Sequence, residues 1–386
     1  MKNFLSILND FFLIQKGKYN KKKSSENTFA FLVHSRSYKD IYRKYPIFRY
    51  IPESIGHYII NHLWPITLSQ VTGVKSVHTK QEIRGYVLGI TMTAEYMMSH
   101  RKKALKKIRD ALYLARGKGI NIVGLGGLTS SLSGGGTKLL DIPINITTGH
   151  AYTAFNVTQT LLKIHTIIGI PKIVTKIAIV GAAGSVGSMS ALILARDHFP
   201  EITLVDLSKK QESLNNLVKQ IRCFNSNIII NISNSISDIQ KSDLIITATN
   251  AAEALITPNI VKEGMIFVDD AQPSDIHPDV LKMENVLVLE AGIVDTPGIN
   301  SNFNYGLKSR TDNFCCMAEL LILASNEWNK HYVIDRATIE HVDSISAMGY
   351  NLGFQVASFQ NFLESISEKK INHIREIIRK KYALQS

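Results

Sequence analysis

The chain has 386 residues, of which 45% are hydrophobic and 20% are charged, a composition typical of a folded protein with two or three domains. Its 44 Lys and Arg outnumber its 32 Asp and Glu, and the net charge of +12 either serves solubility or favours an acidic partner or a phosphorylated cofactor. Three cysteines exclude a disulfide-stapled scaffold and indicate a reducing, cytoplasmic setting.

Residues 1–28 are interpreted as a basic N-terminal tail. Asn9 and Asp10 interrupt its apolar stretch and no cleavage pattern follows, which argues against a signal peptide. The tail is expected either to dock or to be disordered. As a helix it would also suit a membrane surface, because it would carry an apolar stripe of Phe4, Leu5, Ile7, Leu8, Phe11 and Phe12.

Residues 29–150 are predicted to form an α/β substrate and catalytic domain. A basic helix over 100–119 carries Leu105, Ile108, Leu112 and Ala115 on one side. A strand over 120–125 then enters the loop GGLTSSLSGGGT, whose glycines predict sharp turns or close approach of the backbone to a ligand.

Residues 151–300 are predicted to form a Rossmann-type domain. Short, uninterrupted apolar runs are typical of strands in a parallel sheet that helices cover on both faces. The runs are 176–180, 202–205, 228–232, 244–248, 265–268 and 286–289. Residues 301–386 are predicted to be a C-terminal helical segment, with one helix starting near Asn313 and another over 361–382. The fold class is therefore α/β, with a doubly wound parallel sheet.

A glycine loop joins the first of these strands to a helix in the stretch KIAIVGAAGSVGS. Gly181 permits the tight turn, Gly184 lets the backbone approach a pyrophosphate, and Gly187 lets helix and strand pack closely. Ser185 and Val186 lie at the helix N-terminus, which favours phosphate. The strand, turn and helix context predicts a dinucleotide site, with a structural glycine turn as the alternative.

The identity of the dinucleotide stays open between NADH and NADPH. Asp206 ends the second strand, where a carboxylate would bind the ribose hydroxyls of NADH. Lys209 and Lys210 follow and could hold the 2′-phosphate of NADPH instead. Thr249 and Asn250 end the fourth strand and are either cofactor contacts or an ordinary turn.

Two adjacent cysteines open the helix near residue 313. Thr311, Asp312 and Asn313 are acceptable N-caps, so the second or third helical position falls on Cys315 or Cys316. The oriented N–H groups of a helix N-terminus favour a nucleophilic thiolate. A buried, inert cysteine is the alternative. A thiolate combined with a hydride donor would suit reduction of a thioester to an aldehyde.

Four motifs in order resemble the fatty aldehyde-forming long-chain acyl-[acyl-carrier-protein] reductases. They are LGGLTSS (125–131), ITTGHAYTA (146–154), IAIVGAAGSVGS (177–188) and NFCCMAELL (313–321), the last followed by Trp328. The resemblance covers most of the chain from about residue 29.

This resemblance implies specific roles for several residues. Cys316 corresponds to the nucleophile of a Cys-x-Ala-Glu pattern, while Cys315 sits where a small residue would do. Thr147, Thr148 and Gly149 become cofactor or substrate candidates, and His150, which replaces a frequent Asn, is either a proton donor or a packing residue.

The expected partner is acyl carrier protein or acyl-CoA, with a peripheral membrane contact as a further option and no nucleic acid. The basic helix would be the docking face for the acidic carrier. Its basic residues are Arg101, Lys102, Lys103, Lys106, Lys107 and Arg109. Two other functions stay open: reduction of another activated acid, such as glutamyl-tRNA, and a non-catalytic Rossmann regulator that senses the nicotinamide redox ratio.

Overall fold

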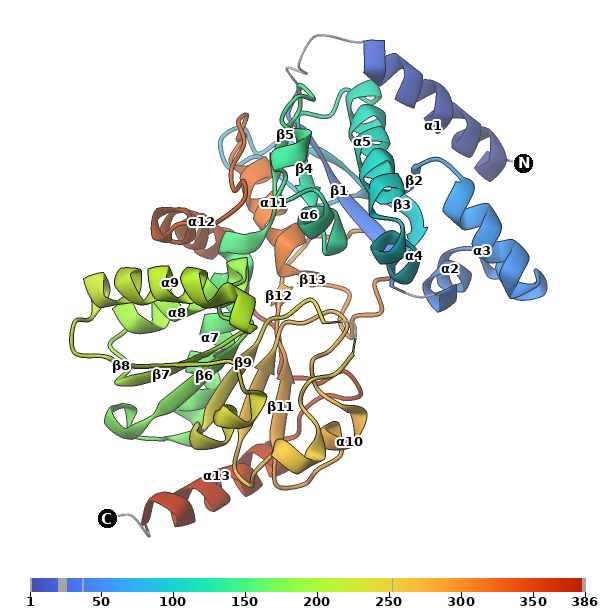
Figure 1. The fold of residues 1–386 in the computed structure, drawn as a ribbon. Helices are drawn as coiled ribbons and strands as arrows, with labels where there is room; N and C mark the ends of the chain where they lie inside the picture. The colour runs from blue at the N-terminus through green and yellow to red at the C-terminus, as the bar shows by residue number, and fades with distance from the viewer. Residues whose placement is uncertain (1, 20–25, 37, 252, 384–386) are drawn as a thin grey trace. The chain divides into compact units, whose positions relative to one another are not determined.

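A computed structural model describes residues 2–19, 26–36, 38–251 and 253–383 (Figure 1). The chain forms two compact units. Unit 1 comprises Met1–Tyr152, Asp295–Ala337 and Asp343–Phe354, and unit 2 comprises Thr153–Val294, Thr338–Val342 and Gln355–Ser386. Among the described residues, no helix combines the length and the apolar character needed to cross a bilayer.

Unit 1 is built on a five-stranded sheet of order β2-β3-β1-β4-β5, in which only β2 is antiparallel to its neighbour. The strands are β1 (Thr28–Ser35), β2 (Ile66–Val71), β3 (Arg84–Thr93), β4 (Ile122–Leu125) and β5 (Asn145–Thr147). The α-helices are α1 (Lys2–Tyr19), α2 (Tyr38–Lys44), α3 (Glu53–His62), α4 (Ala94–Ser99), α5 (Arg101–Gly117), α6 (Leu128–Leu132) and α11 (Cys315–Ser325). Unit 1 also contains two short 3-10 helices, η1 (Pro46–Tyr50) and η2 (Thr137–Leu139), and the strand β13 (Asp312–Phe314). Unit 1 is therefore an α/β unit, and it includes segments from residues 295–337 and 343–354 in addition to the N-terminal part of the chain.

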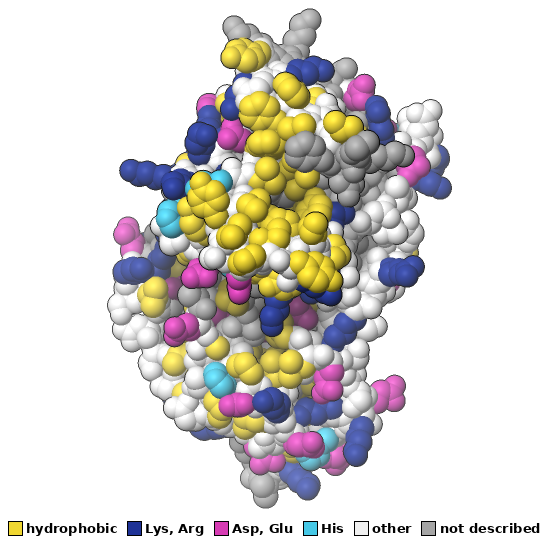
Figure 2. Space-filling view, turned by 90° about the vertical axis from the view of Figure 1, so that its right-hand side faces the viewer, with side chains coloured by type: hydrophobic (Ala, Val, Ile, Leu, Met, Phe, Trp, Pro, Cys, Tyr) yellow, Lys and Arg dark blue, Asp and Glu magenta, His cyan; other side chains and the backbone are white. Residues whose placement is uncertain are grey.

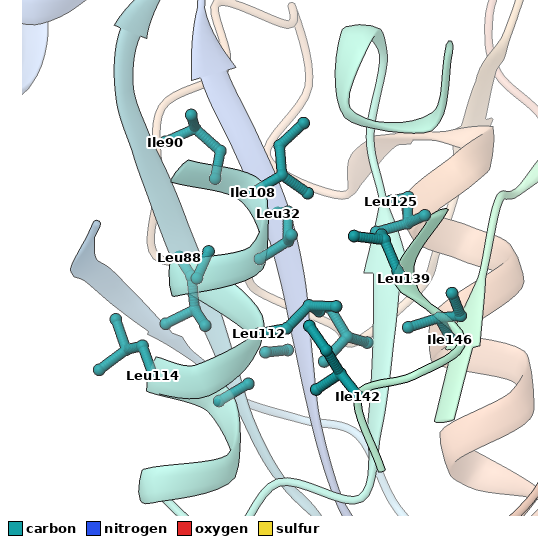
Figure 3. Close-up of a cluster of buried hydrophobic side chains, with 14 of the residues drawn as sticks. Leu32, Leu88, Ile90, Ile108, Leu112, Leu114, Leu125, Leu139, Ile142 and Ile146 are labelled. Atoms are coloured by element: carbon teal, nitrogen blue, oxygen red, sulfur yellow. The ribbon is translucent and has the colours of Figure 1, made fainter. Parts of the chain in front are cut away.

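The core of unit 1 lies between the sheet and α5 (Figure 3). Of the stripe predicted on α5, Ile108, Leu112 and Ala115 are fully buried and Leu105 is partly buried. Leu32 and Leu88 project from the strands into the same cluster. Burying side chains of this size stabilises the fold by about 1.5–3 kcal/mol each.

The predicted N-terminal tail is a helix of unit 1. Helix α1 lies against α5 so closely that a Cβ on Gly17 would be 1.9 Å from the Tyr113 carbonyl oxygen, and one on Gly117 would be 2.0 Å from that of Leu13. Glycine is needed at both crossings, and the sequence gives no direct sign of such a pairing. The lysine-rich stretch 20–25 and the side chain of Phe4 lie outside the described residues. Apolar side chains gather on the surface of this part of unit 1 (Figure 2).

Unit 2 contains a six-stranded parallel sheet of order β11-β10-β9-β6-β7-β8. Its strands are β6 (Lys176–Val180), β7 (Glu201–Val205), β8 (Ile229–Ser233), β9 (Leu244–Thr247), β10 (Ile266–Asp269) and β11 (Leu287–Glu290). Its helices include α8 (Ser185–Arg196), α9 (Gln211–Phe224), α10 (Pro278–Leu281) and α13 (Glu368–Ala383). All six predicted strands are present, and the strand order is that of a Rossmann fold. The predicted fold class is confirmed.

The predicted C-terminal segment, residues 301–386, is not a separate unit. Cys316 and its helix belong to unit 1, whereas α13 belongs to unit 2. Lys381 Nζ and Tyr382 Oη each lie 2.7 Å from a carboxylate oxygen of the buried Asp243, at the start of β9. The division between the units falls within three elements: the helices α7 (His150–Ile168) and α12 (Ile339–Asn351) and the strand β12 (Ile293–Asp295). A two-residue strand, β14 (Gln355–Val356), precedes α13.

Candidate active site

Helix α11 leaves a single residue, Cys316, partly accessible. The other ten residues of the helix are buried, including Cys315 at 1% exposure. Apolar residues on all faces explain the burial of this helix. Because successive helical residues point about 100° apart, the burial of Cys315 and the access to Cys316 are compatible.

The helix begins one residue later than predicted. Phe314 is the N-cap and supplies no side-chain hydrogen bond, so Cys315 and Cys316 are the first and second helical residues. The predicted caps fail because Asp312 and Asn313 lie in the extended strand β13, where Asn313 Nδ2 donates to Thr296 Oγ1 at 2.7 Å. Cys316 nevertheless lies in the first turn, where the helix favours negative charge.

Glu319 ties α11 to the segment that starts α7. Its carboxylate is fully buried and accepts hydrogen bonds from the Thr147 hydroxyl, from Gly149 N at 3.1 Å and from Tyr152 N at 3.0 Å. Burial raises the pKa of Glu319, and these hydrogen bonds oppose the shift. Glu319 therefore also satisfies N–H groups at the start of α7 that no carbonyl of that helix can reach.

Three of the four motifs meet around Cys316. Gly149 has φ of +82°, and a Cβ built on it would lie 2.3 Å from Cys316 Cβ, so no side chain fits there. His150 Nε2 lies 3.2 Å from the hydroxyl oxygen of Ser130, in the glycine and serine-rich loop. The fourth motif, the glycine loop, belongs to unit 2.

Two protonatable groups adjoin these contacts, and both are neutral near pH 7. Burial lowers the pKa of His150 to about 4, so the imidazole is a neutral hydrogen-bonding group rather than an acid in this state. Burial raises the pKa of Tyr305, and the nearby Cys316 adds to that shift. The Tyr305 hydroxyl donates to Met317 Sδ at 3.2 Å.

Thr147 and Thr148 differ in what their side chains contact. Thr147 is fully buried; its hydroxyl donates to Glu319 and accepts from Val333 N at 3.3 Å, so it serves the fold of unit 1. The Thr148 hydroxyl is buried and has no hydrogen-bond partner within the described part of the chain. It is therefore the better ligand candidate of the two.

Glu319→Gln is expected to destabilise unit 1 by about 1–3 kcal/mol, because the amide group replaces an acceptor beside buried N–H donors. It is also expected to slow acylation of Cys316 while leaving cofactor affinity unchanged. Chemical denaturation, adduct formation by mass spectrometry and cofactor titration measure the three effects. Glu95→Gln, at an exposed carboxylate of α4, is the matched control. Wild-type stability together with a wild-type acylation rate in Glu319→Gln would contradict this role.

The glycine loop of unit 2 forms a cradle that fits a dinucleotide. Gly181 has φ of +80°, and a Cβ on Gly187 would be 2.4 Å from the Gly181 oxygen, so both positions require glycine. Gly184 is the extended N-cap of α8, and Ser185 and Val186 are the first residues of that helix. Main-chain N–H groups at this helix N-terminus suit a pyrophosphate.

Asp206 and Thr249 both lie at this loop. Asp206 Oδ2 accepts from Ala183 N at 2.8 Å, which places the carboxylate at the turn. The Thr249 methyl carbon would be 3.1 Å from a Cβ on Gly181, whereas the Thr249 N–H and hydroxyl both donate to Asp275. Asn250 is exposed, and Lys209 and Lys210 lie exposed in the turn after Asp206.

Asp206→Ala is expected to shift cofactor preference from NADH toward NADPH by about tenfold, equivalent to about 1.4 kcal/mol. The substitution removes an acceptor for the ribose hydroxyls and a charge that would repel a 2′-phosphate. Fluorescence titration with both cofactors gives the ratio of dissociation constants. Asp279→Ala, at an exposed carboxylate of α10, should leave that ratio unchanged. An unchanged ratio in Asp206→Ala would place Asp206 away from the ribose.

Only part of the predicted docking helix is available to a partner. Arg101, Lys102, Lys103 and Lys106 are exposed. Lys107 is used internally: its Nζ donates to Asn61 O at 2.9 Å and to Thr91 O at 3.0 Å, and burial lowers its pKa to about 8. Arg109 is paired with Asp141. The prediction of six docking residues is corrected to four because tertiary contacts engage the other two.

The sequence reasoning did not identify Tyr305 or the role of Glu319. A single charged residue within the apolar helix CCMAELLILAS was a usable signal for Glu319, because a buried carboxylate needs partners. Tyr305 lies in an irregular segment and has no comparable signal.

Comparisons with known proteins agree with the division of the chain into two units, because the matching family model lies wholly within unit 2. A family model described as shikimate / quinate 5-dehydrogenase matches residues 170–292, which contain all six strands of the unit 2 sheet. A structure of shikimate 5-dehydrogenase from Listeria monocytogenes, in complex with shikimate and NAD, is 10% identical with a TM-score of 0.36, and the match covers 86% of this chain and 99% of that one. The family match and the glycine loop that lies inside it assign an NAD(P)H cofactor to unit 2.

Three curated proteins are similar over longer or shorter stretches. Long-chain acyl-[acyl-carrier-protein] reductase from Synechococcus elongatus is 24% identical over 313 residues, covering 75% of this chain and 85% of the reductase. Glutamyl-tRNA reductase from Cyanophora paradoxa is 34% identical over 122 residues, covering 29% and 26%. Aminotransferase PigE from Serratia sp. is 23% identical over 301 residues, covering 75% of this chain, which spans about a third (34%) of PigE. The chain is an NAD(P)-dependent oxidoreductase of the Rossmann type. It is a distant relative of both reductases.

Proposed function

We propose that this protein reduces a long-chain acyl thioester, acyl-ACP or acyl-CoA, to a fatty aldehyde through an acyl-enzyme on Cys316. The observation that carries the proposal is the placement of Cys316, the one accessible residue of a buried helix, in its first turn and one helical turn before Glu319. The similarity to a long-chain acyl-[acyl-carrier-protein] reductase supports the choice of substrate class.

The first step needs only groups of unit 1. The Cys316 thiolate attacks the thioester carbonyl carbon, a new carbon–sulfur bond forms, and the bond to the carrier sulfur breaks. The departing carrier thiolate takes up a proton. The helix N-terminus stabilises negative charge on the Cys316 sulfur, and Glu319 holds this turn against Gly149.

The second step needs the cofactor that unit 2 binds. Gly184, Ser185 and Val186 would hold its pyrophosphate, and Asp206 would bind its ribose. When bound, the reduced nicotinamide supplies the hydride that converts the acyl group to the aldehyde. Cys316 then leaves the former carbonyl carbon as a thiolate, ready for another acyl group. The neutral Tyr305 hydroxyl, which donates to Met317 Sδ, adds no charge in this region.

The carrier is expected to contact the exposed basic residues of α5. Phosphopantetheine carries a phosphate and acyl carrier proteins are acidic, so Arg101, Lys102, Lys103 and Lys106 offer complementary charge. Such rim charges accelerate association more than they strengthen the final complex.

Intact-mass analysis without nicotinamide tests the proposal. Incubation with acyl-ACP, or with acyl-CoA in a parallel arm, should add the mass of one acyl group to the protein. Subsequent addition of NADPH or NADH should remove the adduct and release aldehyde. Absence of an adduct with every thioester would refute the acyl-enzyme mechanism.

Reduction of a different activated acid is the second candidate, because the match to glutamyl-tRNA reductase has the higher identity over its 122 residues. Glutamyl-tRNA in place of the thioester distinguishes the two by adduct mass. A non-catalytic nicotinamide sensor is a third class. Alkylation of Cys316 would leave the function of a sensor intact but would abolish that of either reductase.

A further inference from the structure

Helix α3 turns an apolar face toward solvent. Ile55, Tyr58 and Ile59 follow the i, i+3, i+4 spacing that normally marks a face packed in the core, yet they are 52%, 66% and 39% exposed. The opposite face of the same helix is already filled, because Gly56 and Ile60 are buried. The apolar outer face is therefore additional to what the fold needs.

Neighbouring elements extend this surface. Ile47 and Tyr50 of η1 are 67% and 87% exposed, and Leu5 and Phe12, seven residues apart on α1, are 63% and 66% exposed. Helix α1 adjoins the segment that follows α3, because Trp64 Nε1 donates to Ile7 O at 2.8 Å and the ring centroids of Trp64 and Phe11 lie 5.0 Å apart. We call the set the apolar face (Figure 2); it consists of Leu5, Phe11, Phe12, Ile47, Tyr50, Ile55, Tyr58 and Ile59.

Close packing beneath the face keeps it outward. A Cβ on Gly56 would lie 1.4 Å from the Tyr38 hydroxyl oxygen, and Tyr38 stacks on His57 with ring centroids 4.6 Å apart. Helix α3 therefore cannot rotate its outer residues inward without pushing Tyr38 out of the core. A contiguous apolar surface of this kind marks a binding site.

The charge around the face is basic. Between residues 38 and 62 there are four lysines or arginines and two acidic residues, and Lys39, Arg43 and Arg49 are exposed. Asp40 is paired with Arg36 and Arg43, which leaves Lys39, Lys44 and Arg49 against Glu53 in this stretch. The whole chain carries +12, so a second copy docking through the same face would bring like charges together.

We propose that the apolar face docks on the surface of an anionic phospholipid bilayer. Tyrosines beside aliphatic residues suit the interface between headgroups and acyl chains, and surrounding lysines and arginines suit anionic headgroups. The elements would lie in the interface plane and would not span the bilayer. This proposal rests on the surface alone and is independent of the proposed reductase activity.

Vesicle co-sedimentation of the full chain tests the proposal. Vesicles of phosphatidylcholine mixed with phosphatidylglycerol should bind the protein, and vesicles of phosphatidylcholine alone should bind it much more weakly. Ile55→Ser combined with Tyr58→Ser should reduce partitioning into the mixed vesicles by at least about tenfold, because buried apolar area drives the contact. The matched control is Ile173→Ser combined with Val174→Ser, which removes two exposed apolar residues of unit 2 (82% and 41% exposed) and should bind like the wild type.

Four results would overturn the proposal. They are no binding by the wild type, equal binding by the Ile55→Ser, Tyr58→Ser variant, equal binding to vesicles without phosphatidylglycerol, and a lipid-free dimer that this variant dissociates. The last result, measured by sedimentation velocity, would assign the face to a second copy. Thermal unfolding checks that the variant is folded, and Ile47→Ser combined with Tyr50→Ser tests the same face if it is not.

Discussion

Cys316→Ser is expected to abolish both the acyl adduct and aldehyde formation, with turnover falling by at least about 10³-fold. A serine hydroxyl is almost wholly protonated near pH 7 and is a weak nucleophile unless a general base activates it. The carboxylate of Glu319 and the imidazole of His150 already have other partners: Glu319 accepts from Thr147, Gly149 and Tyr152, and His150 Nε2 lies at the Ser130 hydroxyl. Intact-mass analysis after incubation with acyl-ACP, followed by an aldehyde assay, measures both losses.

Cys315→Ala is the matched control because it removes the neighbouring thiol of the same helix. Cys315 is 1% exposed, so the substitution should cost about 1 kcal/mol of stability and leave most of the activity. The adduct should therefore form in the wild type and in Cys315→Ala but not in Cys316→Ser. An adduct mapped to Cys315, or turnover that survives the loss of Cys316, would refute the assignment and leave only the cofactor unit supported.

The sheet of unit 2 was predictable because its strands are buried on both faces. Runs such as 176–180 and 244–248 have no polar interruption, and this pattern has few alternatives once helical segments separate the runs. The glycine loop was also predictable, because the backbone geometry at Gly181 and Gly187 requires glycine. The spacing of the glycines in the sequence therefore indicates the shape of the loop.

Unit 1 was harder to predict because its contacts join residues far apart in the chain. Residues 1–28 were predicted to be a tail because their composition is basic, whereas helix α1 is held to α5 by backbone approach at Gly17 and Gly117. Lys107 resembled the exposed lysines beside it in the sequence, yet its ammonium group binds two carbonyl oxygens of other elements. The composition of a short stretch does not predict contacts of this kind with distant parts of the chain.

In the candidate site too, local features could be predicted from the sequence, whereas contacts between distant residues could not. Cys316 was identified from local signals, namely a helix start and a short motif, and the structure adds that it is the partly accessible member of the pair, whereas Cys315 is buried. The contact of Gly149 with Cys316 and the hydrogen bonds of Glu319 span more than 160 residues of sequence. Only the folded unit shows that these motifs form one cluster.

Gly184→Val is expected to weaken nicotinamide cofactor binding at least about 100-fold, or by about 2.8 kcal/mol, without unfolding unit 2. Gly184 has an ordinary extended backbone (φ −72°, ψ 169°), so valine can adopt its conformation. A Cβ there would have only two neighbours within 4 Å, the Gly181 oxygen at 3.0 Å and the Ala248 oxygen at 3.8 Å, so the fold can accommodate it with a small shift. The added methyl groups would instead occupy the space in which the backbone approaches the pyrophosphate.

Cofactor titration by fluorescence, with thermal unfolding to verify the fold, measures this effect. Gly184→Ala should give a smaller loss of affinity, because it adds one carbon to the cradle rather than three. Gly187→Val should instead destabilise the unit, since a Cβ at that position would lie 2.4 Å from the Gly181 oxygen. The acyl adduct on Cys316 should still form in Gly184→Val, because acylation precedes the step that uses the cofactor. If folded Gly184→Val binds NADH and NADPH like the wild type, the loop is a structural turn and the cofactor site lies elsewhere.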